Sequence, residues 1–256
     1  MSLRSVLTAL AICAALPGAA QDVWVLGEIH DNPAHHAEQA AQVEKLQPAA
    51  IVFEMLTEDQ AARVTSDLRG DANALAAAID WDASGWPDFS MYHPIFTAAP
   101  EAAIHGAMVP RAAAGAVFDD GLVAVFGGDA ARYGLDEDLP ADQQTAREAL
   151  QMQAHCDALP EDMLPGMVGV QRLRDAVLAR AVVRAMDETG GPVAVITGNG
   201  HARRDWGMPA ILARAAPDLD IWVLGQTEAD QPLEGDFDIV KSARAPDRPD
   251  PCAVFQ

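Results

Sequence analysis

The chain has 256 residues, of which 50% are hydrophobic and 21% are charged, and its 38 acidic and 17 basic residues give a formal net charge of −21. This length and composition indicate one globular domain and exclude disulfide scaffolds, collagen-like chains and general disorder. Because few cations are present to neutralise phosphates, nucleic acids and anionic membrane surfaces are poor candidate partners.

Residues 1–20 have the pattern of a secretory signal peptide. Arg4 precedes an apolar run at residues 6–16, and small residues at 17–20 lead up to Gln21. The apolar run is too short to span a bilayer. We therefore expect cleavage of this leader and a periplasmic or secreted protein.

The three cysteines leave two questions open. A lipid anchor at Cys13 is the less favoured alternative to a cleaved leader, because Ile12 stands where lipoprotein processing prefers a small residue. Cys156 and Cys252 remain after cleavage. In an oxidising compartment they could form one disulfide, but the sequence does not decide between a bridge and two free thiols.

Strands and helices alternate along the predicted chain. Apolar runs predict strands at residues 23–27, 50–53, 103–109, 192–197, 221–225 and 238–240, and helical patterns occupy residues 33–46 and 209–215. Strand–helix–strand units of this kind imply a parallel sheet with right-handed crossovers. The predicted fold class is α/β, a mainly parallel sheet flanked by helices.

One long segment is nearly all helix-forming. It runs from residue 142 to residue 188 and is divided by Leu159-Pro160. A helical insertion of this length between strands usually covers one end of the sheet. We predict a helical lid subdomain at about residues 140–188, within a single α/β domain of residues 21–256.

Polar residues that could carry chemistry follow three of the strands. Glu28 and His30 follow the first strand, Glu54 follows the second, and His201 follows the strand that ends at Thr197. Parallel sheets bind ligands beyond the carboxyl ends of their strands, so these side chains are expected to share one pocket. Imidazoles and carboxylates together can bind a divalent metal ion or serve as acid and base.

The two histidines belong to matching Gly-x-x-His segments, which begin at Gly27 and at Gly198. His30 and His201 are therefore predicted metal ligands, with Glu54 and with His36 as the better placed of the adjacent pair at 35 and 36. The alternative is that the polar cluster only ties strand ends together in a binding or scaffold protein.

A set of motifs, taken in order along nearly all of the chain after the leader, resembles the ChaN family of haem-binding, iron-regulated proteins within the Tiki superfamily. The motifs are the segment from Gly27 to His36, Phe53-Glu54-Met55, Trp86-Pro87, Tyr92-His93-Pro94, His155-Cys156, Gln171, Arg174-Asp175, and the segment from Gly198 to Ala202. The resemblance implies an α/β core with a helical subdomain, export to the bacterial envelope, and haem binding in haem or iron uptake.

Haem requires an iron ligand and partners for two propionates. Tyr92 and His93 lie between Trp86 and Phe96 and are the first candidates as ligands, with His155 as an alternative; this stretch could equally dock a helix onto the sheet. The candidate propionate partners are three arginines, although the last of them could instead form an ion pair with Asp175. They are Arg111, Arg172 and Arg174.

The resemblance leaves the chemistry open. The favoured hypothesis is an exported protein that binds haem or an iron-containing small molecule for uptake, with a homodimer and envelope uptake components as further partners. The alternative follows Tiki-type relatives, which use two Gly-x-x-His motifs and a glutamate for metal-dependent proteolysis. In such a metal-dependent hydrolase, His30 and His201 would hold the ion and Glu28 or Glu54 would activate water. Whether the chain is an enzyme is not decided by its sequence.

Overall fold

The computed structural model describes residues 21–250 and 252–253. The predicted signal peptide and Cys13 lie outside these residues. Within them the chain forms a six-stranded sheet with the order β3-β2-β4-β1-β5-β6, in which every pair of neighbouring strands is parallel. The strands are β1 (Val23–Glu28), β2 (Ala50–Phe53), β3 (Ala103–Gly106), β4 (Val193–Gly198), β5 (Ile221–Glu228) and β6 (Ile239–Ala243). The predicted α/β fold class is confirmed.

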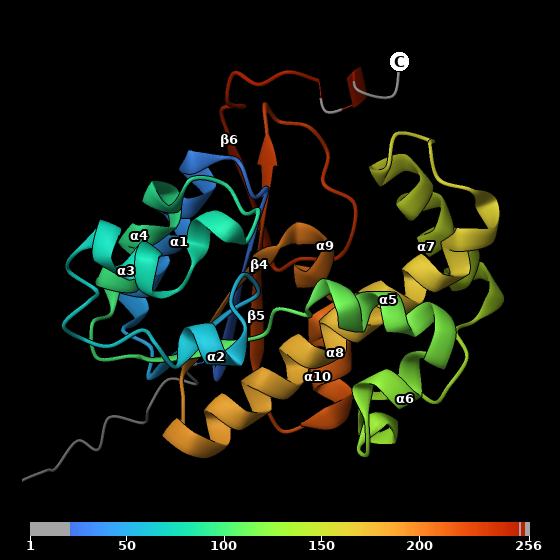
Figure 1. Ribbon diagram of the computed structural model, residues 1–256, viewed down its shortest axis with the longest axis horizontal. Helices are drawn as coiled ribbons and strands as arrows, with labels where there is room; N and C mark the ends of the chain where they lie inside the picture. Colours follow the sequence, from blue (N-terminus) through green and yellow to red (C-terminus); the bar gives the residue numbers. More distant parts are fainter. Residues whose placement is uncertain (1–20, 251, 254–256) are drawn as a thin grey trace, which may run out of the picture.

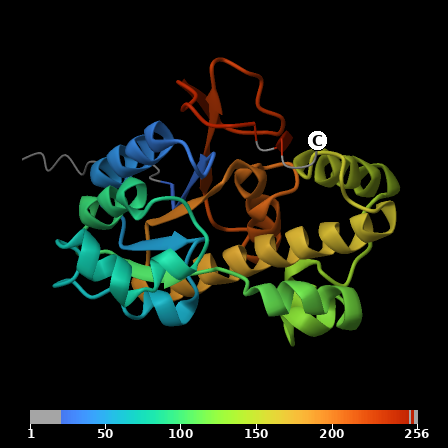
Figure 2. The same cartoon turned by 45° about the horizontal axis from the view of Figure 1, so that its top comes forward.

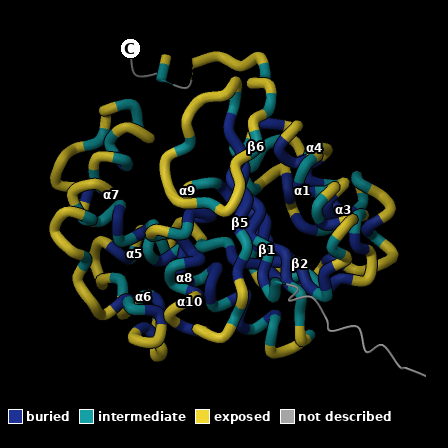
Figure 3. Tube along the Cα trace, turned by 180° about the vertical axis from the view of Figure 1, so that it is seen from behind, coloured by how far each residue is buried: buried dark blue, intermediate teal, exposed yellow. Residues whose placement is uncertain are grey.

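Helices cover both faces of the sheet (Figure 1). On one face lie α1 (Pro33–Leu46), α2 (Glu58–Ala61), α3 (Ala72–Ala78) and α4 (Phe89–Ala98). On the other lie α5 (Arg111–Asp120), α6 (Leu122–Phe126), α7 (Ala141–Ala154), α8 (Leu164–Thr189) and α10 (Met208–Ala215). The burial colours place the strands in the covered middle of the molecule and the exposed residues on the outer helices and loops (Figure 3).

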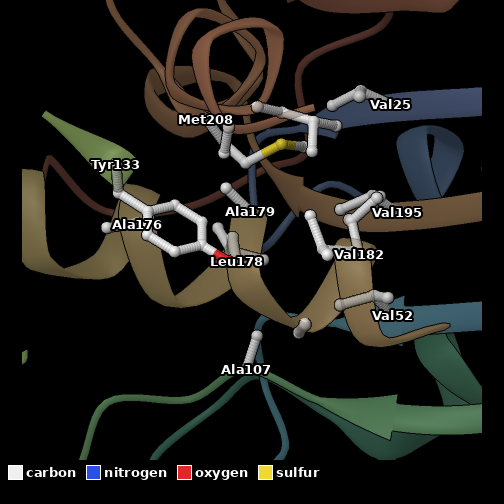
Figure 4. Close-up of a cluster of buried hydrophobic side chains, with 14 of the residues drawn as sticks. Val25, Val52, Ala107, Tyr133, Ala176, Leu178, Ala179, Val182, Val195 and Met208 are labelled. Atoms are coloured by element: carbon white, nitrogen blue, oxygen red, sulfur yellow. The ribbon is translucent and has the colours of Figure 1, made fainter. Parts of the chain in front are cut away.

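Two apolar cores hold these layers together, one on each face of the sheet. Alternate strand residues point to opposite faces, so Val25 packs toward α8 and α10 whereas Leu26 packs toward α1 and α4. Figure 4 shows Val25, Val52 and Val195 of the sheet beside residues of α8. Strands covered on both faces read as continuous apolar runs, which is why the sequence revealed them.

The helical part differs from the predicted lid in two ways. It begins earlier, because α5 and α6 precede the predicted start near residue 140. The long helix α8 is also a core element: Ala179 and Val182 are fully buried and pack against the sheet. Helix α7 and the loop that follows it lie at the outer edge of the helical side, away from the sheet (Figure 1).

The third predicted strand is shorter than expected. It ends at Gly106, where a Cβ atom would lie 2.2 Å from the backbone oxygen of Thr57. The chain then leaves the sheet, and residues 107–109 become part of a cavity wall. Close backbone packing, which the apolar pattern does not report, ends this strand.

The two cysteines whose pairing the sequence left open are joined. Cys156, just after α7, is bonded to Cys252 near the chain end, with an S–S distance of 2.04 Å. The bond therefore ties the C-terminal segment to the end of α7. Among the described residues, no helix combines the length and the apolar character needed to cross a bilayer.

Candidate functional site

Polar side chains meet where three neighbouring strands end. Glu28 is the last residue of β1, Glu54 follows β2, and His201 lies in α9 (Asn199–Ala202), directly after β4. Since β4 lies between β1 and β2, the sheet order brings these residues to one edge. This is the edge at which open parallel sheets bind ligands.

A cavity of about 1330 Å³ lies over this edge. Its walls come from the strand ends on one side and from α5, α7 and α8 on the other, elements that Figure 2 shows from the side of the strand ends. The volume exceeds the roughly 300–1,000 Å³ of ordinary small-ligand pockets. Apolar and aromatic side chains form much of the wall, among them Trp86, Met108, Leu150, Val168, Leu178 and Trp206.

Glu28 organises the polar groups at the end of β1. Its Oε1 accepts hydrogen bonds from Nδ1 of His30 at 2.7 Å and from the Tyr92 hydroxyl at 3.1 Å. Nδ1 of His36 lies 3.2 Å from its Oε2. Burial raises the pKa of Glu28, but its contacts with the two imidazoles outweigh burial and lower the pKa to about 2. Glu28 is therefore an ionised, buried anchor.

His30 reaches the cavity, with 34% of its side chain exposed, whereas the His201 side chain is 9% exposed. Its ring packs on Trp86 with 4.9 Å between ring centroids. Nδ1 is held by Glu28, and the described part of the chain supplies no hydrogen-bond partner for Nε2. A Cβ atom on Gly198 would lie 2.9 Å from Nε2, so the ring occupies space that only a glycine leaves free.

His201 lies between two carboxylates. Its Nδ1 donates to Asp175 Oδ1 at 2.7 Å, and its Nε2 lies 3.7 Å from Glu54 Oε1. Glu54 also accepts hydrogen bonds from the Thr197 hydroxyl at 2.6 Å and the Gly198 amide at 2.8 Å. Burial lowers the pKa of His201, but the charges of Glu54 and Asp175 outweigh it and raise the pKa. His201 is thus a buried imidazole held at Nδ1 by Asp175, and the two carboxylates around it favour its protonated form.

The helical side of the cavity carries guanidinium groups. Arg111 of α5, Arg147 of α7 and Arg174 of α8 all line it. Arg111 and Arg174 make no hydrogen bond or ion pair with any described residue, so these two predicted propionate partners are available to a ligand. The third, Arg172, donates to the backbone oxygens of Gly134 and Glu137 and does not line the cavity. Burial lowers the pKa of Arg147 to about 10, which still leaves the group charged at neutral pH.

Two predicted haem ligands on α4 lie outside the cavity wall. Tyr92 is fully buried, and its hydroxyl donates a hydrogen bond to Glu28. Burial and the nearby carboxylate raise the pKa of Tyr92 above its ordinary value. Nε2 of His93 lies 2.8 Å from the backbone oxygen of Arg69, on another side of α4. In this structure α4 docks onto the sheet, which was the alternative interpretation of this stretch, and neither side chain lines the cavity. The role of Tyr92 and His93 as haem ligands stays a prediction.

His155 is also outside the cavity wall. It caps the end of α7, with Nδ1 at 2.8 Å from the backbone oxygen of Gln151. His36, the weaker predicted metal ligand, is fully buried, and its Nε2 contacts the backbone oxygen of His30 at 2.8 Å. Neither side chain lines the cavity.

The four predicted metal ligands do not form a ready metal centre. In residues 21–250 and 252–253 no three His, Cys, Asp or Glu side chains are arranged to hold an ion. His30 and Glu54 line the cavity with His201, but the last is already paired at Nδ1 with Asp175. The structure brings His30, His201 and Glu54 together at the cavity, whereas His36 is buried and does not line it.

Two side chains of the site were missed from the sequence. Arg147 and Gln151 on α7 line the cavity and are both buried. A signal was present, since they are four residues apart on a helix that has no apolar stripe. A search for apolar periodicity alone passes over such a polar face.

A model of the family described as haem-binding uptake, Tiki superfamily, ChaN matches residues 17–212. The chain belongs to the ChaN family. A solved structure of ChaN from Campylobacter jejuni, which describes cofacial haem binding, is similar over 86% of this chain and 86% of that chain, with 19% identity and a TM-score of 0.63. The type III effector HopBA1 is similar over 87% and 88% of the two chains, with 13% identity and a TM-score of 0.48. No curated protein matches the chain significantly.

The family predicted from the motifs is thus confirmed. The likeness to the Campylobacter ChaN structure shows that the two chains share the α/β fold. The family match favours the haem-binding hypothesis over the metal-dependent hydrolase. The roles of individual residues of this chain in haem binding stay predictions.

Proposed function

We propose that the chain binds haem in the cavity over the strand ends, with Nε2 of His30 as a ligand of the iron. The observation that carries this proposal is the asymmetry of the His30 ring. Nδ1 is fixed by the Glu28 carboxylate at 2.7 Å, while Nε2 is left without a partner at the cavity among the described residues. A carboxylate behind an imidazole is the common arrangement that orients a metal-binding histidine.

The donor set of the cavity fits a haem. An imidazole can take the iron, the apolar and aromatic wall offers a surface for a flat macrocycle, and the arginines of the helical side can receive propionates. Trp86, beside His30, is part of that aromatic surface. The family description and the haem-binding Campylobacter relative support the same ligand.

In this proposal haem is the cargo of the protein. We propose a role in haem or iron uptake, following the family description, and export through the predicted leader at residues 1–20. Mass spectrometry of protein from the cell envelope, with a mature chain beginning at Gln21, would support export. Retention of residues 1–20 on cytoplasmic protein would contradict it. Pairing of two copies and delivery to envelope uptake components stay predictions.

Titration of the purified protein with hemin tests the proposal. We expect a shifted Soret band that is lost or strongly altered in His30→Ala and unchanged in His93→Ala and His155→Ala, whose side chains lie outside the cavity wall. Thermal unfolding of each variant, followed by circular dichroism, checks that it folds. Hemin binding by His30→Ala with the spectrum and affinity of the original protein would reject His30 as the ligand.

A further inference from the structure

The C-terminal part of the chain connects the two walls of the cavity. Residues 244–250, which we call the C-terminal strap, follow β6 and run toward the end of α7 (Figure 2). The strap is attached to the sheet side at its beginning. Beyond its other end Cys252 is bonded to Cys156, just after α7. The strand-end loops and the helical wall are therefore joined by a segment outside the sheet.

The attachment on the sheet side lies beside His30, which lines the cavity. Arg248 of the strap donates to Asp31 Oδ1 at 2.8 Å. The side-chain amide of Asn32, which caps α1, donates to the backbone oxygen of Arg244 at 3.1 Å. The strap thus contacts the two residues that follow His30 in the chain.

The attachment at α7 is covalent, and α7 has few other strong contacts. The only buried residues among its 14 are Arg147 and Gln151, so no apolar side chain of this helix is buried. Leu150 and Ala154, in its second half, line the cavity. An apolar stripe normally fixes a helix on its neighbours. Because α7 lacks one, the position of this wall depends strongly on the bond.

The bond is half-buried at both cysteines. The turn that carries it is strained, because Cys156 and Asp157 both have a left-handed backbone, with φ 59° and φ 56°. Residues other than glycine rarely adopt this conformation, and they keep it where surrounding contacts impose it. Opening the bond removes one of the constraints on this turn.

We propose that the Cys156–Cys252 bond is a site of thiol–disulfide exchange with a dithiol, and that its opening lets α7 move away from the strand ends. One thiolate of the dithiol attacks a sulfur of the bond, and the second thiolate then resolves the mixed disulfide. The dithiol loses two electrons and two protons and becomes a disulfide, and the two cysteines gain them as thiols. This inference goes beyond the proposed function, since it concerns access to the cavity for any ligand.

Opening the bond should also loosen the attachment beside His30. Arg248 and Asp31 are 31% and 46% exposed, and exposed ion pairs contribute little on their own. With the bond closed, the strap is held at both ends, so the Arg248 contacts form within a short closed segment. Release at Cys156 removes this advantage, and the two walls of the cavity loosen together.

Hydrogen–deuterium exchange with mass spectrometry tests the proposal on the folded protein, before and after treatment with dithiothreitol at neutral pH without urea. Alkylation with iodoacetamide measures how many thiols have become free. We expect the bond to open without urea, and the amides of α7 to exchange faster, on the order of 10-fold or more. Residues 29–32 should show a smaller increase. Helix α10 serves as the internal reference and should exchange as before.

Three variants separate the two attachments. Cys156→Ser/Cys252→Ser should exchange like the protein treated with dithiothreitol and should not respond to dithiothreitol. Arg248→Gln should loosen residues 29–32 while the closed bond keeps α7 unchanged. Arg214→Gln removes the same charge from an exposed pair with Glu137 and should change neither region.

Two results would overturn the inference without any variant. If dithiothreitol frees the thiols only when urea is added, the bond is sealed in the folded protein and is not an exchange site. If the bond opens and the exchange of α7 stays the same, the bond does not hold the helical wall. Neither measurement uses hemin, so failure here is distinct from failure of the proposed function.

Discussion

Nδ1 of His30 lies 2.7 Å from Oε1 of Glu28, two residues earlier in the chain. The carboxylate is fully covered while the imidazole is one-third exposed to the cavity. This short separation makes the orientation of a cavity-facing histidine a local property of the end of β1. It also couples the charge states of the two groups: contacts with His30 and His36 lower the pKa of Glu28 to about 2, and Glu28 and Glu54 raise the pKa of His30 to about 9 against the effect of burial.

The pair predicts that the free energy of unfolding of the unliganded protein falls in two pH ranges, an acid flank and an alkaline flank. The ordinary pKa of Glu28 is 4.5, so its contribution is present above that pH and is lost as the pH falls toward about 2. The ordinary pKa of His30 is 6.5, so its contribution is complete below that pH and is lost as the pH rises through about 9. We expect the acid flank to cost at most roughly 3 kcal/mol, and the alkaline flank less because His30 is partly exposed to solvent.

Urea unfolding at a series of pH values measures both flanks. Glu28→Gln should remove the acid flank, because the titrating carboxylate is gone, and should reduce the alkaline flank, because one of the charges that raise the pKa of His30 is lost while Glu54 remains. Glu58→Gln, which alters only an exposed pair with Arg184, should leave them in place. A pH profile of Glu28→Gln that superimposes on that of the original protein would contradict the coupling.

Gly198→Ala should weaken hemin binding with little loss of stability. The added methyl group would lie 2.9 Å from Nε2 of His30, so the ring must move away from its place at the cavity. The backbone of Gly198 has φ −65°, which alanine adopts freely. We expect a hemin affinity about tenfold lower, and a loss in the free energy of unfolding of about 1 kcal/mol, the lower end of overpacking costs.

Gly200→Ala is the matched control, since no described atom lies within 4 Å of a Cβ atom built there. Titration with hemin and urea unfolding of both variants give the comparison. If Gly198→Ala and Gly200→Ala bind hemin alike, Gly198 is not needed for the position of His30.

The residues that strand order brings together could be predicted from the sequence. The directions in which side chains of one helix point could not. His30, Glu54 and His201 could be placed together because each follows an apolar run, and parallel strands end at the same edge. Tyr92 and His93 are neighbours on one helix and so point about 100° apart. Only the packing of α4 shows that one meets Glu28 and the other meets Arg69.

The helical side of the cavity was harder to predict for a related reason. Arg147 belongs to no recognisable sequence motif. Its place on the cavity wall depends on how α7 lies against α8 and Trp206. The pairing of Cys156 with Cys252 joins residues 96 positions apart and follows from the same tertiary arrangement. Contacts between distant segments of this kind have no local pattern in the sequence.

Asp175→Asn should destabilise the protein strongly. Asp175 and His201 are both buried, and His201 loses the carboxylate that balances its charge. Removing one partner of a buried ion pair typically costs roughly 3–5 kcal/mol. Urea unfolding at neutral pH measures the loss, and Glu137→Gln, from an exposed pair with Arg214, should cost no more than about 1 kcal/mol. Equal effects of the two substitutions would contradict a structural role for the Asp175–His201 pair.

Reduction of the Cys156–Cys252 bond should loosen α7 and with it the helical wall of the cavity. The helix buries no apolar residue, so its position depends on its packing against α8 and on the disulfide at its end. Opening a loop of this length costs about 2–5 kcal/mol of unfolding free energy. We expect the double variant Cys156→Ser/Cys252→Ser to show that loss together with a weaker hemin affinity. A reductant should reproduce both effects in the original protein and have none on the double variant. Unchanged hemin affinity in a measurably destabilised double variant would show that α7 keeps its place without the bond.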